Sequence, residues 1–187
     1  MSGPRLVLAS TSPQRRAILE QLRLPFDVVA PVYEELGDDP VEHAVGKARS
    51  VAGEAAGRPV LGVDTTVVCE GRVFGKPADA GEAARMLAAL AGRAHEVVSG
   101  LCLLGDGWQE AEREVTSVTF RSLSGREVDA YVAAGEWEGR AGGYAIQGLG
   151  ASLVAGVEGD YLNVVGLPGA LLVRLLAERF PGSYGFG

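Results

Sequence analysis

Cysteine and histidine are scarce in this chain, and neither residue type forms a metal-binding motif. Cys69 and Cys102 have no paired spacing and lie in apolar runs, so we expect two reduced core thiols. His43 and His95 have no HxH, HExxH or CxxC companions, which argues against a zinc site. A Walker A sequence, a GxGxxG after a strand and a GxSxG elbow are also missing. These absences exclude the ordinary NTPase, dehydrogenase and hydrolase templates.

Long apolar runs and a basic surplus are missing as well. With no signal peptide and no run long enough to cross a bilayer, we expect a cytoplasmic protein with no membrane partner. Seventeen basic against twenty-four acidic residues give a net charge of −7. This balance speaks against a nucleic-acid partner but not against a nucleotide, which needs only a few local cations. With 47% hydrophobic residues, the 187 residues suit one globular domain, 1–187, with room for two lobes and an active-site cleft between them.

The stretch from Arg5 to Leu22 carries the strongest local signal. An apolar run that begins at Leu6 predicts a buried strand, and a small-residue turn leads to Ser12 and Pro13, which fit the N-cap and first position of a helix. Arg15 and Arg16 fall in the first turn, where the helix dipole disfavours cations. Free N–H groups, hydroxyls and arginines together suit a phosphate chain. A surface helix with solvated arginines is the alternative.

Strand and helix patterns alternate through residue 91, and a meander with two more helices follows. This order predicts a mixed α/β fold, with a long twisted sheet flanked by helices. Capping boxes at 39–42, 79–82 and 124–127 predict helix starts, and Glu70-Gly71 predicts a tight hairpin turn. We further expect a strand over 152–157, a turn at Gly159-Asp160 and a final helix from about Leu167.

Five charged residues are candidates for chemistry. We expect Asp64 at the carboxyl end of a short apolar strand over 60–63, where it could bind a metal, accept a proton from water or simply cap a turn. Glu34 and Glu35 lie in an acidic loop that could complete a cation site or be only solvated. Lys47 and Lys76 are two of very few lysines, and Lys76 in Gly-Lys-Pro suits a phosphate as a point charge. This set suits metal-assisted hydrolysis of a phosphoanhydride.

Glycine is dense between residues 139 and 150, with five glycines in GRAGGYAIQGLG. Glycine loses the most entropy on ordering, so this segment predicts backbone that turns tightly or approaches something closely.

Taken together, the stretches resemble the Maf family of nucleoside triphosphate pyrophosphatases. The resemblance runs from about Leu6 to Leu176, and its blocks follow the family's order. They are LASTSPQRR, the Glu34-Glu35 pair, GKARSVA, GVDTTVV, FGKPADAGEAARML, HEVVSG, VTFRSLS, AYVAAGE, RAGGYAIQGLGA and NVVGLP. The family fold is an elongated mixed sheet flanked by helices, similar to that of the inosine triphosphate pyrophosphatases. The resemblance also implies a homodimer.

By this resemblance, the chain would cut a nucleoside triphosphate between its α and β phosphates, with Mg²⁺ or Mn²⁺ as the divalent cation. Asp64 matches the acidic catalytic residue that takes a proton from water, and Glu35 matches a glutamate of the metal and catalytic shell. Both would hold the metal, and Lys76 would join them as a catalytic residue. The matches to substrate-binding positions are Ser10, Ser12, Gln14, Arg15, Lys47, Thr65 and Gln147.

In the family, the residues at certain positions vary with substrate preference, and at these positions the chain matches the dTTP/UTP branch. These are Asp64-Thr65 and Ile146-Gln147, and an amide at 147 can both donate and accept at a uracil or thymine edge. Gln14 departs from the branch, which has arginine there, and Gly46 replaces a usual glutamate. The alternatives are a 7-methyl-GTP pyrophosphatase, disfavoured by Thr65 and Gln147, and a nucleotide-binding regulator of cell division with little turnover.

Overall fold

The strand–turn–helix signal at the start of the chain folds as predicted. In the computed structural model, which describes residues 3–186, strand β1 spans Leu6–Ala9 and is buried throughout. Helix α1 spans Pro13–Gln21, with Pro13 in its first turn. The side chain of Ser12 caps it by accepting a hydrogen bond from the N–H of Arg15. The cap therefore satisfies one of the free N–H groups at the start of the helix.

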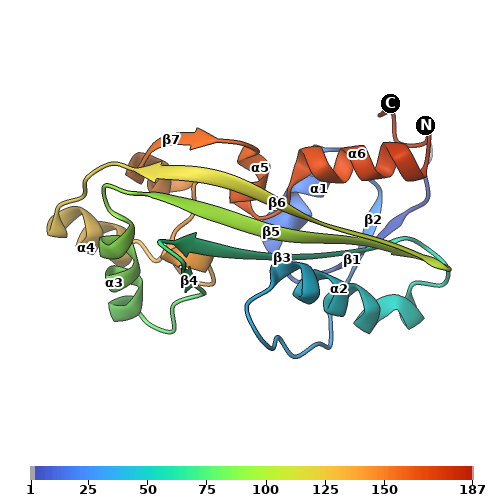
Figure 1. Cartoon of the computed structure of the whole chain (residues 1–187), viewed down its shortest axis with the longest axis horizontal. Helices are drawn as coiled ribbons and strands as arrows, with labels where there is room; N and C mark the ends of the chain where they lie inside the picture. The colour runs from blue at the N-terminus through green and yellow to red at the C-terminus, as the bar shows by residue number, and fades with distance from the viewer. Residues whose placement is uncertain (1–2, 187) are drawn as a thin grey trace. The chain divides into compact units, whose positions relative to one another are not determined.

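The described chain divides into two compact units (Figure 1). Unit 1 holds the described residues up to Asp64, together with Ser99–Glu114 and the described residues from Gly166 onward. Unit 2 holds Thr65–Val98 and Val115–Val165. Three strands contribute residues to both units: β3 (Val60–Cys69), β5 (Ala94–Gly105) and β6 (Trp108–Phe120).

Unit 1 is a layered α/β body. Besides β1 and α1 it contains β2 (Phe26–Val29), α2 (Pro40–Val51), the short helix η1 (Ala52–Glu54) and α6 (Gly169–Arg179). Within this unit, α2 lies on one side of the strands, with α1 and α6 on the other (Figure 1). Small residues of α2, Ala44 and Ala48, pack with Val7 and Ala9 of β1 in one apolar core. Small side chains allow the helix to approach the strands closely.

Unit 2 contains a β-hairpin, one further antiparallel strand and several helices. Its elements are β4 (Arg72–Phe74), α3 (Ala80–Leu90), α4 (Gly125–Ala133), η2 (Ala141–Gly143), η3 (Gly148–Leu153), β7 (Val154–Glu158) and α5 (Tyr161–Val165). Glu70 and Gly71 both have positive φ angles, of 51° and 76°, as a two-residue hairpin turn requires. The predicted capping box at Ser124 and Glu127 is present in full. A core cluster that includes Leu87, Phe120 and Tyr131 fills this unit.

The strands form a seven-stranded mixed sheet, which confirms the predicted α/β class. The order is β2-β1-β3-β5-β6-β7, and β4 pairs with β3 outside this path. β1 pairs in parallel with both β2 and β3, as strands connected through helices do. β4 and β7 pair antiparallel with β3 and β6.

The expected position of Asp64 at the end of a short strand is wrong. β3 continues through Asp64 to Cys69, because Val67 and Cys69 are buried and the strand leads directly into the Glu70-Gly71 turn. The parallel pairing with β1 nevertheless stops at Gly62, opposite Ala9. Asp64 therefore lies beyond the carboxyl end of the neighbouring parallel strand, although it lies inside its own strand.

The expected strand over 152–157 begins two residues later than predicted. Residues up to Leu153 form the helix η3, and β7 starts at Val154, opposite an irregular register at Thr119/Phe120 of β6. The predicted turn at Gly159-Asp160 instead leads into the short helix α5. The carboxylate of Asp160 accepts a hydrogen bond from the N–H of Leu162 at 2.8 Å. Asp160 is thus a helix cap that the pattern of a simple turn did not reveal.

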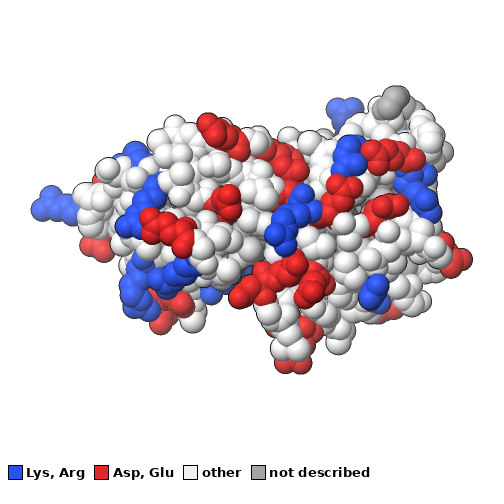
Figure 2. Space-filling view, viewed as in Figure 1, with Lys and Arg blue, Asp and Glu red and all other residues white. Residues whose placement is uncertain are grey.

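The surface has no single electrostatic character on the face shown in Figure 2. Lys and Arg side chains are interspersed there with Asp and Glu side chains. Among the described residues, no helix is both long enough and apolar enough to span a membrane.

The buried His95 makes the stability of the protein depend on pH. Its Nε2 lies 2.9 Å from the hydroxyl of Tyr144, and its ring packs edge-on against Phe120. Its Nδ1 is buried with no hydrogen-bond partner among the described residues. Burial lowers the pKa of His95 to about 4, so the folded protein holds the neutral ring.

Stability should therefore be lost as pH falls from the unfolded pKa of about 6.5 through the folded pKa of about 4. The contribution of His95 to this loss is on the order of 3 kcal/mol. Urea unfolding of the wild type and of His95→Asn at pH 7 and pH 4.5 measures it. The variant should be less stable at pH 7 and lose less on acidification. An equal loss in both proteins would show that His95 is not the titrating group.

Candidate active site

Lys47 stands between two carboxylates in unit 1. Its Nζ lies 2.6 Å from Oδ1 of Asp64 and 2.5 Å from Oε1 of Glu35. The side chains of Lys47 and Asp64 are only 11% and 15% exposed, whereas that of Glu35 is 49% exposed. An ammonium shared by two carboxylates in this partly buried setting neutralises charges that would otherwise repel each other.

Arg15 brings a second cation to the same carboxylates. Burial lowers the pKa of the Arg15 guanidinium, and the negative charges of Asp64 and Glu35 oppose this effect. Its Nη1 donates to the hydroxyl of Ser10 at 3.1 Å, and its Nε donates to the carbonyl of Gly166 at 2.9 Å. The arginine that seemed misplaced at the positive end of α1 is therefore held inward, which disfavours the alternative of a solvated surface helix.

Close packing of α2 on β3 brings Lys47 to Asp64. At Gly62 of β3, a Cβ atom would overlap the carbonyl oxygen of Ala44 and crowd the side chain of Ala48, both in α2. Glycine at this position therefore lets the helix backbone touch the strand. Lys47, one turn along α2 from Ala44, then reaches the carboxylate two residues beyond Gly62.

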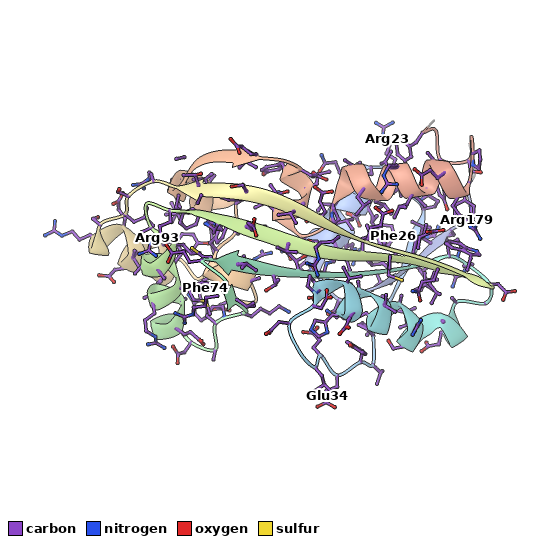
Figure 3. The ribbon with its side chains drawn as sticks, viewed as in Figure 1. Arg23, Phe26, Glu34, Phe74, Arg93 and Arg179 are labelled. Carbon is purple, nitrogen blue, oxygen red and sulfur yellow. The ribbon has the colours of Figure 1, made fainter. Side chains whose placement is uncertain are left out.

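Gly46 has a related role for the acidic loop. A side chain at Gly46 would overlap the aromatic ring of Tyr33, so the missing glutamate at 46 makes room for this ring. The Tyr33 hydroxyl also lies 3.4 Å from Nδ1 of His43, and the two rings meet edge-on. Tyr33 thereby holds the loop against α2 two residues before Glu35. Figure 3 shows Glu34 at the edge of this loop, pointing away from the body.

The remaining residues predicted for the site fall into two groups. In unit 1, the Ser12 hydroxyl donates to the side-chain oxygen of Gln14 at 3.1 Å, so Gln14 lies beside the cap of α1. Thr65, Lys76 and Gln147 belong to unit 2, where Lys76 and Gln147 are exposed. The structure of unit 1 thus brings Ser10, Ser12, Gln14, Arg15, Glu35, Lys47 and Asp64 together.

Sequence reasoning missed the residues that position the site. The Gly166 carbonyl lies far along the chain, and no motif linked it to Arg15. Tyr33 was not singled out, although a tyrosine beside the acidic pair and a glycine inside a predicted helix were both visible. Glycine inside a helix costs about 1 kcal/mol relative to alanine, so such a position signals a close contact.

Two carboxylates and two cations can bind and process a phosphate chain. Arg15 and Lys47 can neutralise phosphate oxygens, the Ser10 and Ser12 hydroxyls can donate to them, and Asp64 can accept a proton from water. Within residues 3–186, no group of three or more His, Cys, Asp or Glu side chains is arranged to hold a metal. Asp64 and Glu35 alone suit a cation such as Mg²⁺, which takes one or two carboxylates and completes its shell with phosphates and water.

Comparison with known proteins gives this fold and site a class, that of the Maf-like proteins. The family model "Maf-like protein" matches residues 5–179, and the chain belongs to this family. The resemblance drawn from the sequence is therefore confirmed. A relative from Moorella thermoacetica, named dTTP/UTP pyrophosphatase, is 50% identical over 182 residues, covering 92% of this chain and 94% of the relative. A Deinococcus radiodurans protein of the same name is 41% identical over 192 residues, covering 100% of this chain and 97% of the relative.

Replacing the shared cation tests how strongly the site depends on it. In Lys47→Met, the Asp64 and Glu35 carboxylates lose their common partner and repel each other. We expect a loss of about 3 kcal/mol in unfolding free energy at pH 7.5, at the low end for a broken buried pair because Glu35 is half-exposed.

Urea unfolding at pH 7.5 measures this effect, and Lys76→Met is the matched control. These are the only two lysines of the chain, and Lys76 is exposed, so its replacement should change stability by less than about 0.5 kcal/mol. A Lys47→Met protein as stable as the control would contradict a structural dependence on the shared ammonium.

Proposed function

We propose that this chain is a nucleoside triphosphate pyrophosphatase that prefers dTTP and UTP. Water cleaves the bond between the α and β phosphates, giving a nucleoside monophosphate and pyrophosphate. The observation that carries the proposal is the placement of Lys47 between Asp64 and Glu35, with the partly buried Arg15 close enough for their charges to act on it. The names of relatives at 41% and 50% identity over nearly the whole chain support the substrate class.

The proposed roles follow from the chemistry of each side chain. Asp64 accepts the proton of the attacking water, and Lys76 with Arg15 and Lys47 stabilises the charge on the phosphates. Ser10 and Ser12 donate hydrogen bonds to phosphate oxygens. Thr65, Gln14 and Gln147 contribute to recognition of the nucleoside, for which the amide of Gln147 offers both a donor and an acceptor.

Asp64 and Glu35 are the residues that would hold a divalent cation. When bound, Mg²⁺ or Mn²⁺ would supply positive charge to the phosphate oxygens. Both carboxylates already share one cation, the Lys47 ammonium, and this supports a joint role in binding a cation. The cytoplasmic location, the homodimer and the cleft between two lobes of one domain stay predictions.

Turnover by carboxylate variants tests the catalytic roles. Pyrophosphate release from dTTP and UTP with Mg²⁺ should fall at least about 100-fold in Asp64→Asn, because the proton acceptor is lost. Glu35→Gln should also fall, whereas Glu34→Gln should retain wild-type turnover. Glu34 is the matched control, because it neighbours Glu35 but projects outward from the loop, away from the body of the protein (Figure 3).

The same assay with CTP, GTP and 7-methyl-GTP distinguishes the alternative functions. Wild-type turnover concentrated on 7-methyl-GTP would place the chain in that branch. It would contradict the preference for dTTP and UTP that Thr65 and Gln147 indicate. Nucleotide binding without pyrophosphate release would favour the binding regulator. Normal turnover by Asp64→Asn would overturn the assignment of Asp64 alone.

Gln14 offers a separate test of nucleotide preference. Its side-chain oxygen accepts a hydrogen bond from the Ser12 hydroxyl, whereas the dTTP/UTP branch that the chain resembles has an arginine at this position. Gln14→Arg adds a cation beside a predicted substrate hydroxyl, so the KM for UTP should fall by a few-fold, in line with about 1 kcal/mol for a charge-assisted contact. Steady-state kinetics measures the change, with Arg16→Gln as control on the exposed side of α1. An increased KM in Gln14→Arg would show that glutamine is the better residue here.

A further inference from the structure

The segment Ala145–Gly150, which carries Gln147, is held at both ends by unit 2. Its first N–H, of Ala145, donates to the hydroxyl of the buried Tyr131 of α4 at 2.9 Å. The next side chain, Ile146, is buried in the unit 2 core. At Gly150, a Cβ atom would overlap the Ala145 carbonyl oxygen, so the segment turns back on itself. Gln147 lies in this closed turn and is exposed.

One carboxylate, that of Glu136, fixes the far end of the turn. Its Oε1 accepts a hydrogen bond from the N–H of Leu149 at 3.0 Å, and its Oε2 accepts one from the N–H of Gly150 at 3.1 Å. The carboxylate also packs closely against Gly148, because a Cβ atom at this glycine would lie only 2.6 Å from Oε1. Both carboxylate oxygens are thus used by the backbone that follows Gln147, and charge-assisted hydrogen bonds of this kind are strong.

Glu136 caps the start of η3, a role that an N-cap side chain such as that of Gln147 usually has. Gln147 is the N-cap residue of η3, but its side chain makes no cap hydrogen bond. Glu136, from the turn after α4, binds the first N–H groups of η3 in its place. A carboxylate suits these groups because they carry the positive end of the helix dipole. The Gln147 side chain is therefore exposed and is not used to cap the helix that follows it.

We propose that Glu136 is a positioning residue that sets nucleobase preference by fixing the turn around Gln147. This inference rests on the proposed function, in which the Gln147 amide reads the pyrimidine edge. An amide can reject a base whose donor and acceptor are exchanged only if its backbone cannot shift to compensate. UTP and CTP differ in this way, because uracil offers N3–H and O4 where cytosine offers N3 and an amino group.

Glu136→Gln tests the role, because a glutamine can accept from one N–H but turns its own NH₂ toward the other. The ratio of kcat/KM for UTP over CTP should fall at least about tenfold, mostly through a higher KM for UTP. Glu138→Gln is the matched control: it lies two residues away in the same turn and is exposed, and should leave the ratio unchanged. Amide hydrogen exchange at Leu149 and Gly150 should accelerate in Glu136→Gln but not in the control.

The outcomes separate this inference from the proposed function. A wild type that releases no pyrophosphate from UTP or dTTP would overturn the proposed function. A wild type with a UTP preference that Gln147→Ala abolishes, but Glu136→Gln leaves unchanged, would overturn only the role of Glu136. A merely structural role would lower turnover of UTP and CTP equally, which also contradicts the proposal. Should Glu136→Gln unfold, Glu136→Asp keeps the charge on a shorter arm and should lower the ratio by a smaller factor.

Discussion

The ammonium of Lys47 is the charge on which the candidate site depends. Asp64 belongs to a strand and Glu35 to a loop, and without a cation between them their carboxylates would repel each other at close range. The Lys47 ammonium itself loses hydration because it is buried, and its ion pairs with Asp64 and Glu35 compensate for this loss. Arg15 adds a second positive charge, which interacts electrostatically with both carboxylates. The site therefore holds two anions and two cations, whose charges cancel.

Two absent side chains allow this balance to form. Gly62 lets α2 touch β3, which brings Lys47 to Asp64, and Gly46 admits the Tyr33 ring, which brings the loop of Glu35 to α2. Both glycines act through space that a methyl group would fill, and neither supplies a functional group. Helix α2 is thus positioned by contacts on two sides, and Lys47 projects from it to the point where strand and loop meet.

Local signals in the sequence predicted local structure well. The Ser12 cap, the full capping box at Ser124 and the Glu70-Gly71 turn depend on residues within a few positions of each other, so their spacing was sufficient. Only the continuity of β3 through Asp64 was missed. The sequence predicted a strand over 60–63 and, separately, a hairpin strand over 66–69 before Glu70-Gly71, whereas the structure joins the two in one strand with Val67 and Cys69 buried in a core of distant segments. The same limit applies to the site. Charge and residue type indicated Arg15, Lys47 and the carboxylates, but only tertiary packing gives Arg15 the Gly166 carbonyl.

The carboxylates of this chain differ in what their partners allow. Asp64 and Glu35 bind the end of a lysine side chain, which has several rotatable bonds and can exchange one anion for another without moving the backbone. Glu136 binds two backbone N–H groups, and these cannot leave it unless the chain around Gln147 moves. The first arrangement suits groups that must accept a metal or a proton in turn. The second suits a group that holds the neighbouring backbone in place. The partner of each carboxylate, rather than its charge, therefore distinguishes the catalytic carboxylates from the one that positions a recognition residue.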